Sequence, residues 1–71
     1  MPKLPRNVSH DRMVRFLQKR GWSIRPGKRH TVAFKDDVQV AVPRHTSLKI
    51  GTVRAILRVA GISLDDAVRD L

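Results

Sequence analysis

The stretch WSIRPGKRHTVAFKDDVQVAVP, residues 22–43, decides the fold of this chain. It contains three short runs that are rich in β-branched and aromatic residues, and such runs are typical of strands. Pro-Gly-Lys-Arg separates the first run from the second, Asp-Asp separates the second from the third, and both are typical turn sequences. Because short connections join antiparallel neighbours, the stretch predicts a three-stranded antiparallel meander. The expected strands span residues 22–25, 30–35 and 38–42.

Alternation within these runs indicates which faces of the strands pack. Every second residue of the third run is valine, and Gln39 and Ala41 stand between the valines, so one sheet face is expected to pack and the other to be small and polar. In the second run, Val32 and Phe34 share one face. Trp22 is expected to be a core anchor rather than a platform for stacking bases, because the chain has few aromatic residues.

Helix signals flank the meander on both sides. Residues 10–20 are predicted to form a helix, with Ser9 as N-cap and Gly21 as a left-handed stop. The core face of this helix is expected to be Met13, Phe16 and Leu17. A second amphipathic helix starts near Lys49 and ends at Gly61, and a capping-box pattern at Ser63 starts a last short helix.

These elements predict an α+β fold: a small α-β-β-β-α domain whose three-stranded antiparallel sheet carries both helices on one face. A chain of 71 residues fits a single domain over 1–71, and a domain of this size buries only about 60% of the surface of its unfolded chain. The active surface is therefore expected to be shallow. Residues 1–7 carry two prolines that keep them out of a helix, and we expect them to be loosely held.

Composition indicates a polyanionic partner. Fifteen Lys and Arg against six Asp and Glu give a formal net charge of +9, more than solubility requires. With no cysteine there is no disulfide framework or thiolate nucleophile. The start of the chain has no apolar run of signal-peptide length, and no run is long enough to cross a bilayer, so a soluble cytoplasmic protein without a membrane partner is expected.

The first predicted helix carries a basic stripe made of Arg12, Arg15 and Lys19. Two interpretations stand about equal: a solvated helix face, or a face that contacts phosphates, since the stripe has no glutamate partners. Arg54 and Arg58 in the second helix extend the basic surface from another side.

His30 is the candidate catalytic residue, because it follows the basic turn and opens a strand. RNA carries its own nucleophile, the 2′-hydroxyl, so cleavage needs a base, an acid and cations around the phosphate. His30 can supply the acid or base, with Lys28, Arg29 and Arg44 as the cationic clamp. On these residues alone, a lone histidine in a basic loop is more often a solvated side chain than a catalyst.

The other two histidines are not the main candidates for catalysis. His45 is interpreted as a structural or turn residue, with a second acid-base role as the lesser alternative, and His10 as a surface residue of the first helical turn. The histidines are scattered and no carboxylate stands at ligand spacing, so neither a metal site nor a cofactor is expected.

Three segments together resemble the HicA toxins, small mRNA interferases that are paired with HicB antitoxins. They are Gly27-Lys28-Arg29-His30, Val40-Ala41-Val42-Pro43-Arg44-His45, and the helix with its sequel GTVRAILRVAGIS, residues 51–63. The resemblance covers about Val8 to Leu71. It implies a fold like a double-stranded-RNA-binding domain, metal-independent cleavage of mRNA, and a catalytic histidine that corresponds to His30.

The chain departs from this family at one turn, where Lys28-Arg29 stands in place of the small residues of Gly-Ser-His or Gly-Gly-His. The added charges suit a polyanion. The resemblance also implies an acidic HicB-like antitoxin that covers the basic face and shields His30, with the sheet edge and the first helix as docking surfaces.

Two other functions are compatible with the residues. A non-catalytic module that binds double-stranded or single-stranded RNA would have the same fold and charge, although Lys49 stands alone where such domains carry several lysines. A DNA-binding or ribosome-associated structural protein is the third alternative.

Overall fold

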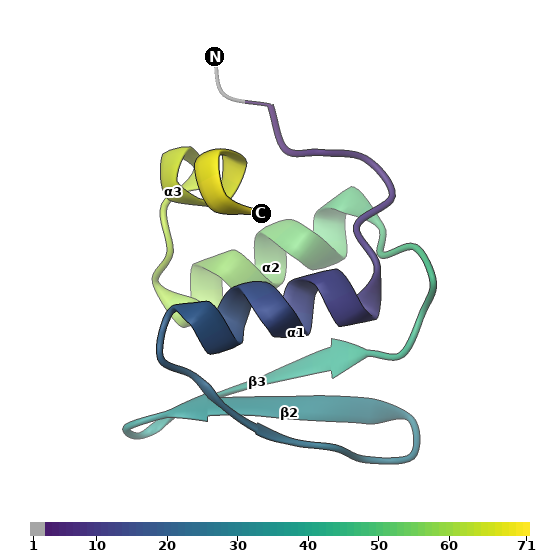
Figure 1. Ribbon diagram of the computed structural model, residues 1–71, viewed down its shortest axis with the longest axis vertical. Helices are drawn as coiled ribbons and strands as arrows, with labels where there is room; N and C mark the ends of the chain where they lie inside the picture. The colour runs from purple at the N-terminus through teal and green to yellow at the C-terminus, as the bar shows by residue number, and fades with distance from the viewer. Residues whose placement is uncertain (1–2) are drawn as a thin grey trace.

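A computed structural model describes residues 3–71 and shows the element order α-β-β-β-α-α (Figure 1). The elements are α1 (His10–Lys19), β1 (Ser23–Arg25), β2 (His30–Lys35), β3 (Val38–Pro43), α2 (Ile50–Ala60) and α3 (Leu64–Asp70). The strands form one antiparallel sheet in the order β1-β2-β3. Both long helices lie on the same side of this sheet, and α3 lies beyond them (Figure 1). The α+β class, the meander and the helices on one face are thus confirmed.

The two hairpin connections differ in width. Lys35 pairs with Val38, so Asp36-Asp37 is a tight two-residue turn, in which Asp36 has a positive φ of 53°. The first connection is wider than the four-residue turn that the sequence predicts, because the last pair between β1 and β2 is Arg25 with Val32. The first two residues of β2 therefore extend past the end of β1 and pair with β3.

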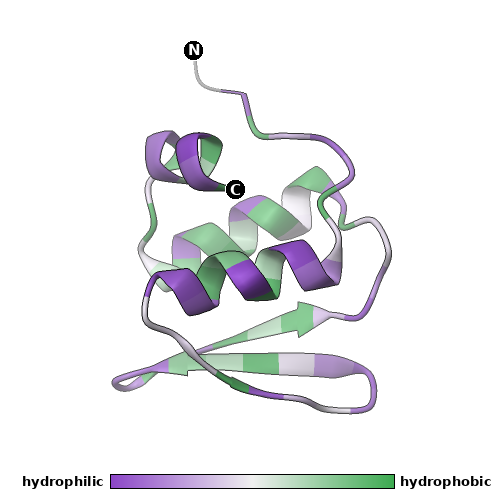
Figure 2. Ribbon diagram, in the orientation of Figure 1, coloured by the Kyte–Doolittle hydropathy of each residue, from purple (hydrophilic) through white to green (hydrophobic). Residues whose placement is uncertain are grey.

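The core lies between the sheet and α1 with α2. As expected, Met13, Phe16 and Leu17 of α1 are buried, and Trp22 is buried beside them. From β2 the core receives the small residues Thr31 and Ala33. Figure 2 shows hydrophobic residues on the helix sides that face the sheet and along the strands.

The larger residues of β2, Val32 and Phe34, lie on the sheet face that points away from the helices, because strand residues alternate between faces. They are half-buried there, and the guanidinium of Arg25 lies over the Phe34 ring at 5.7 Å from its centroid. Thr31 and Ala33 leave room for α1 to approach β2 closely, which accounts for the placement of the smaller side chains inside.

Helix ends follow the sequence signals. Ser9 Oγ accepts a hydrogen bond from the backbone N–H of Arg12 at 3.1 Å, and Ser63 Oγ accepts one from that of Asp66 at 3.1 Å. Gly21 and Gly61 follow α1 and α2 with φ of 91° and 71°, the left-handed conformation of a helix stop. The predicted bounds shift slightly, since α1 ends at Lys19, β1 starts at Ser23 and β3 reaches Pro43.

Ion pairs tie α3 to the end of α1. Arg20 contacts Asp66 at 3.2 Å and Asp70 at 3.4 Å, and Arg69 contacts the same two carboxylates. The hydrogen bond and the attraction of Asp70, with the attraction of Asp66, raise the pKa of Arg69 above its ordinary value. The carboxylates of Asp66 and Asp70 therefore join α3 to the end of α1.

The segment before α1 packs against the domain. Leu4 lies against the core, Ser47 Oγ donates to Asn7 Oδ1 at 3.2 Å, and Val8 forms an isolated bridge with Leu48. Loose holding of residues 1–7 stays a prediction, and residues 1 and 2 lie outside the described part of the chain. In residues 3–71 no helix has the length and apolar character needed to span a membrane.

Replacement by alanine should change stability in opposite directions at Gly51, within α2, and at Gly61, directly after α2. A Cβ at Gly51 meets open space, so Gly51→Ala should raise stability by about 0.5 kcal/mol through helix propensity. Gly61 has φ of 71°, so Gly61→Ala should lower stability by about 1 kcal/mol. Thermal unfolding of both variants checks this, and equal shifts of the two midpoints would contradict the left-handed stop at Gly61.

Candidate active site

His30 is the first residue of β2, is exposed, and pairs with Pro43 of β3. Since Thr31 is buried under the helices, alternation places the His30 side chain on the outer face of the sheet. β1 has already ended at this point, so the imidazole stands where β2 is no longer flanked by β1. This placement leaves the ring open to a large ligand.

Two hydrogen bonds of Arg44 hold the connection before His30. The Nε of Arg44 donates to the carbonyl oxygen of Gly27 at 2.7 Å, and the backbone N–H of Arg44 donates to that of Arg29 at 3.2 Å. A Cβ on Gly27 would lie 2.4 Å from the carbonyl oxygen of His30, which is closer than real atoms approach. Glycine at position 27 is therefore required for the close packing of this connection on the His30 backbone.

A hollow of about 460 Å³ lies beside His30. It wraps the β3 edge, from the outer-face residues Gln39, Ala41 and Pro43 to residues of α2. The α2 lining is Gly51, Thr52, Ala55, Ile56 and Val59. Among the described residues, His30 is thus the sole lining side chain that can exchange a proton near neutral pH.

The structure divides the predicted phosphate-binding residues into two groups. Lys28 and Arg29 are exposed directly before His30, and Arg44 is joined to the same connection by its contact with Gly27. Lys28 and Arg29 thus adjoin His30 in the chain, whereas the Arg44 side chain lines a separate hollow with His10 and Asp11, and none of the three lines the hollow beside His30.

The basic stripe of α1, Arg12, Arg15 and Lys19, is exposed on the side of the helix away from its buried face, and α1 lies on the opposite side of the sheet from His30. Arg12 donates through Nη2 to the carbonyl oxygen of Leu71 at 2.8 Å. The stripe and His30 therefore do not form one continuous site.

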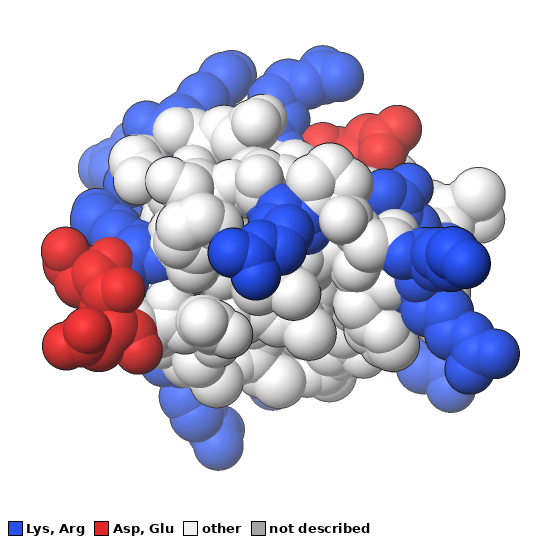
Figure 3. Space-filling model, turned by 90° about the horizontal axis from the view of Figure 1, so that it is seen from below, with Lys and Arg blue, Asp and Glu red and all other residues white. Residues whose placement is uncertain are grey.

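Seen from the sheet side, Lys and Arg side chains stand around the rim of a largely uncharged face, with one in its middle (Figure 3). The few acidic side chains in this view lie at the periphery (Figure 3). A polyanion can thus meet positive charge from several directions.

His10 is not a surface residue, and the prediction for it was wrong. Its side chain is 13% exposed, its Nε2 lies 2.6 Å from the hydroxyl of Thr31, and its Nδ1 lies 2.8 Å from a carboxylate oxygen of Asp11. A carboxylate can only accept, so Nδ1–H donates to Asp11, and Nε2 shares the second hydrogen bond with the Thr31 hydroxyl. The first turn of α1 packs against β2 at this point. The polar sequence of that turn gives no sign of this contact.

Asp11, His10 and Thr31 have the order of a carboxylate, an imidazole and a hydroxyl nucleophile. Thr31 is only 2% exposed, so a substrate cannot reach its hydroxyl. The chain of hydrogen bonds is structural: it satisfies a buried polar group and ties α1 to the residue that follows His30.

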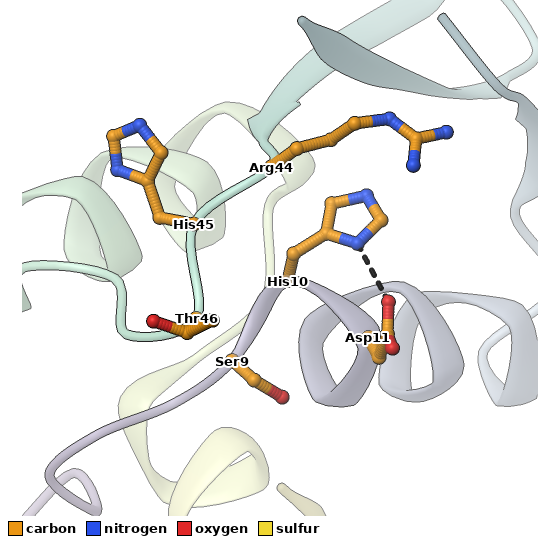
Figure 4. A pocket seen from close by; sticks show the side chains of 6 residues that line it. All are labelled: Ser9, His10, Asp11, Arg44, His45 and Thr46. Atoms are coloured by element: carbon orange, nitrogen blue, oxygen red, sulfur yellow. Dashed lines mark hydrogen bonds and ion pairs between the residues drawn. The ribbon is translucent and has the colours of Figure 1, made fainter. Parts of the chain in front are cut away.

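A second hollow, of about 270 Å³, lies between the start of α1 and the segment after β3 (Figure 4). His10 and His45 both line it, but Figure 4 shows the His45 ring pointing away from His10. The backbone N–H of His10 donates to the carbonyl oxygen of His45 at 3.0 Å, which supports the structural interpretation of His45. Within residues 3–71, no three His, Cys, Asp or Glu side chains gather in a way that could hold a metal ion.

The sequence pointed to His30, Lys28, Arg29 and Arg44 but missed the supporting residues around them. Thr31 was detectable in principle, since a polar residue at an inward strand position needs a partner in the core. No pattern in the neighbouring sequence predicts the tight fit of Gly27 or the contribution of α2 to the hollow.

Comparison with known proteins yields one match. A family described as the HicA toxin of bacterial toxin-antitoxin systems matches residues 11–62. This range includes both strands that meet at His30, the basic connection before it, and α2. No curated protein and no solved structure matches the chain.

Gly27→Ala should displace the His30 backbone, because the new Cβ would overlap the His30 carbonyl oxygen. We expect changed amide chemical shifts for residues 28–31, with the α1 and α2 amides unchanged, in a heteronuclear NMR spectrum. Unchanged shifts at residues 28–31 would show that position 27 tolerates a side chain.

Thr31→Val should cost about 1–3 kcal/mol, because the variant leaves His10 Nε2 without its partner in a part-buried site. Thr46→Val is the control, since Thr46 is exposed and its loss should change stability by less than about 0.5 kcal/mol. Urea unfolding measures both, and equal effects would argue against the His10–Thr31 bond.

Proposed function

The chain belongs to the HicA toxins of bacterial toxin-antitoxin systems, and from this premise we propose that it is a metal-independent endoribonuclease that cleaves mRNA through His30. His30 acts as the general acid or base, and a HicB-like antitoxin neutralises the toxin. The observation that carries the proposal is an exposed histidine that lines an uncharged hollow and directly follows two exposed cations, Lys28 and Arg29, in the chain.

The chemistry needs no group beyond those of RNA and the protein. The imidazole of His30 takes the proton of the 2′-hydroxyl, and the 2′-oxygen attacks the adjacent phosphorus. The bond from phosphorus to the 5′-oxygen breaks, and that oxygen receives the proton that the imidazole took up, directly or through a water molecule that gives one proton and gains another. The products are a 2′,3′-cyclic phosphate and a 5′-hydroxyl, so water is not consumed in this step.

The cations stabilise the negative charge that develops on the phosphate oxygens. Lys28 and Arg29 are free to move toward the substrate because both are exposed. Arg44 uses Nε to hold Gly27, so a phosphate would contact its terminal nitrogens. Arg44 therefore has two proposed tasks, to position the connection and to bind the substrate.

The α1 stripe of Arg12, Arg15 and Lys19 is proposed to contact RNA away from the cleaved bond. It lies on the far side of the helical layer from His30, so it would bind a distant part of a long substrate. Its contribution to affinity should depend steeply on salt, as phosphate contacts do.

The decisive experiment compares the wild-type protein with His30→Ala on a long single-stranded RNA in EDTA. We expect the variant to cleave about 100- to 10,000-fold more slowly, because it lacks the acid-base group, and to bind RNA as the wild type does. A denaturing gel measures cleavage, and fluorescence anisotropy measures binding.

His45→Ala is the matched control, an exposed histidine that lines the other hollow. It should retain cleavage. If the wild type binds RNA but leaves it intact, the protein is a non-catalytic RNA-binding module. If cleavage disappears with EDTA, the reaction depends on a metal.

A further inference from the structure

Two large apolar side chains are exposed at α2 and α3, Ile50 at the start of α2 and Leu64 at the start of α3. Ile50 is 48% exposed and Leu64 is 41% exposed. Each lines a hollow, one of about 360 Å³ beside the N-terminal segment and one of about 430 Å³ along α2, and the two hollows share Arg54 and Leu64. They form one surface, here called the α2–α3 groove. Its apolar lining is Leu4, Ile50, Leu57, Ile62 and Leu64.

The rim of the α2–α3 groove is basic. Lys3, Arg6, Arg54 and Arg58 line it, and among the described residues no aspartate or glutamate does. Two of the three acids of α3, Asp66 and Asp70, are engaged by Arg20 and Arg69, and the third, Asp65, does not line the groove. The groove thus combines exposed aliphatic side chains with four cations.

This surface is separate from the hollow beside His30. The two share no lining residue, although α2 contributes to both. At roughly 100° per residue, the mean direction of the groove residues of α2 is about 150° around the helix from that of the residues that line the His30 hollow. The groove residues of α2 are Ile50, Arg54, Leu57 and Arg58. A ligand can therefore occupy the groove without covering His30.

We infer that the α2–α3 groove is a docking site for the antitoxin, which would insert an acidic segment with at least two large apolar side chains. The inference rests on the proposed function for its partner. The apolar residues of the segment would cover Ile50 and Leu64, and its carboxylates would pair with the arginines of α2. The groove is a different surface from the sheet edge and α1, which the sequence suggested as docking surfaces.

Polypeptide is favoured over RNA as the occupant by the lining of the groove. No aromatic side chain lines it among the described residues, so bases have nothing to stack on. Contact with phosphates would leave the aliphatic side chains of Ile50 and Leu64 in water, whereas an amphipathic segment removes them from it.

The test uses the purified cognate antitoxin and a double variant, Ile50→Glu with Leu64→Glu. Both positions are exposed, so the fold should persist, as circular dichroism would show. We expect antitoxin binding to weaken about 100-fold or more, because the new carboxylates repel an acidic segment and remove its apolar contacts. The free variant should cleave RNA at the wild-type rate.

Val38→Glu is the matched control, since Val38 is 39% exposed and lies outside the groove. It should bind the antitoxin within about twofold of the wild type. The alanine pair, Ile50→Ala with Leu64→Ala, isolates the apolar contribution, and we expect about a tenfold loss.

If the double glutamate variant binds the antitoxin as tightly as the wild-type protein does, the inference is overturned. The inference is also overturned if the variant loses RNA binding but keeps antitoxin binding, because the groove would then be an RNA-binding surface. A wild type that binds the antitoxin through the groove but does not cleave RNA would refute the proposed activity and leave the docking site standing.

Discussion

The hydrogen bond between His10 of α1 and Thr31 of β2 is the interaction on which the rest of the site depends. β2 presents small residues, Thr31 and Ala33, to the helix, and the buried hydroxyl of Thr31 would be costly without a partner. His10 provides that partner at 2.6 Å and is itself held by Asp11. This contact ties the start of α1 to the start of β2, and His30 is the residue next to it. The backbone of the candidate catalytic residue is therefore anchored from inside the domain.

The same region is anchored from outside by the segment after β3. Arg44 holds the carbonyl oxygen of Gly27, and Gly27 packs directly against the His30 backbone. The start of β2 is not paired with β1, so these contacts support the backbone on the side where β1 would otherwise pair. An exposed side chain on a fixed backbone suits acid-base chemistry, which depends on accurate placement of the proton-transferring atom.

Positive charge surrounds the molecule, yet its surfaces differ in character. The hollow at His30 has an uncharged lining beside the imidazole, the α1 stripe is a row of cations, and the α2–α3 groove combines cations with exposed aliphatic side chains. Two different faces of α2 thus line the hollow at His30 and the α2–α3 groove. This arrangement allows substrate cleavage and partner binding to be separate properties of a very small domain.

The sequence by itself determined the elements of the fold and the identity of the candidate residue. Strand alternation, the caps at Ser9 and Ser63, and the glycines at 21 and 61 are local signals, because each depends on neighbours within a few residues. The family match agrees with the resemblance that the segments around His30 and α2 suggested. Only the tertiary structure decided that His10 is part-buried, that Arg44 supports Gly27, and that the α1 stripe is remote from His30. These properties arise from contacts between residues far apart in the chain, and such contacts follow from how the helices pack on the sheet rather than from any local pattern.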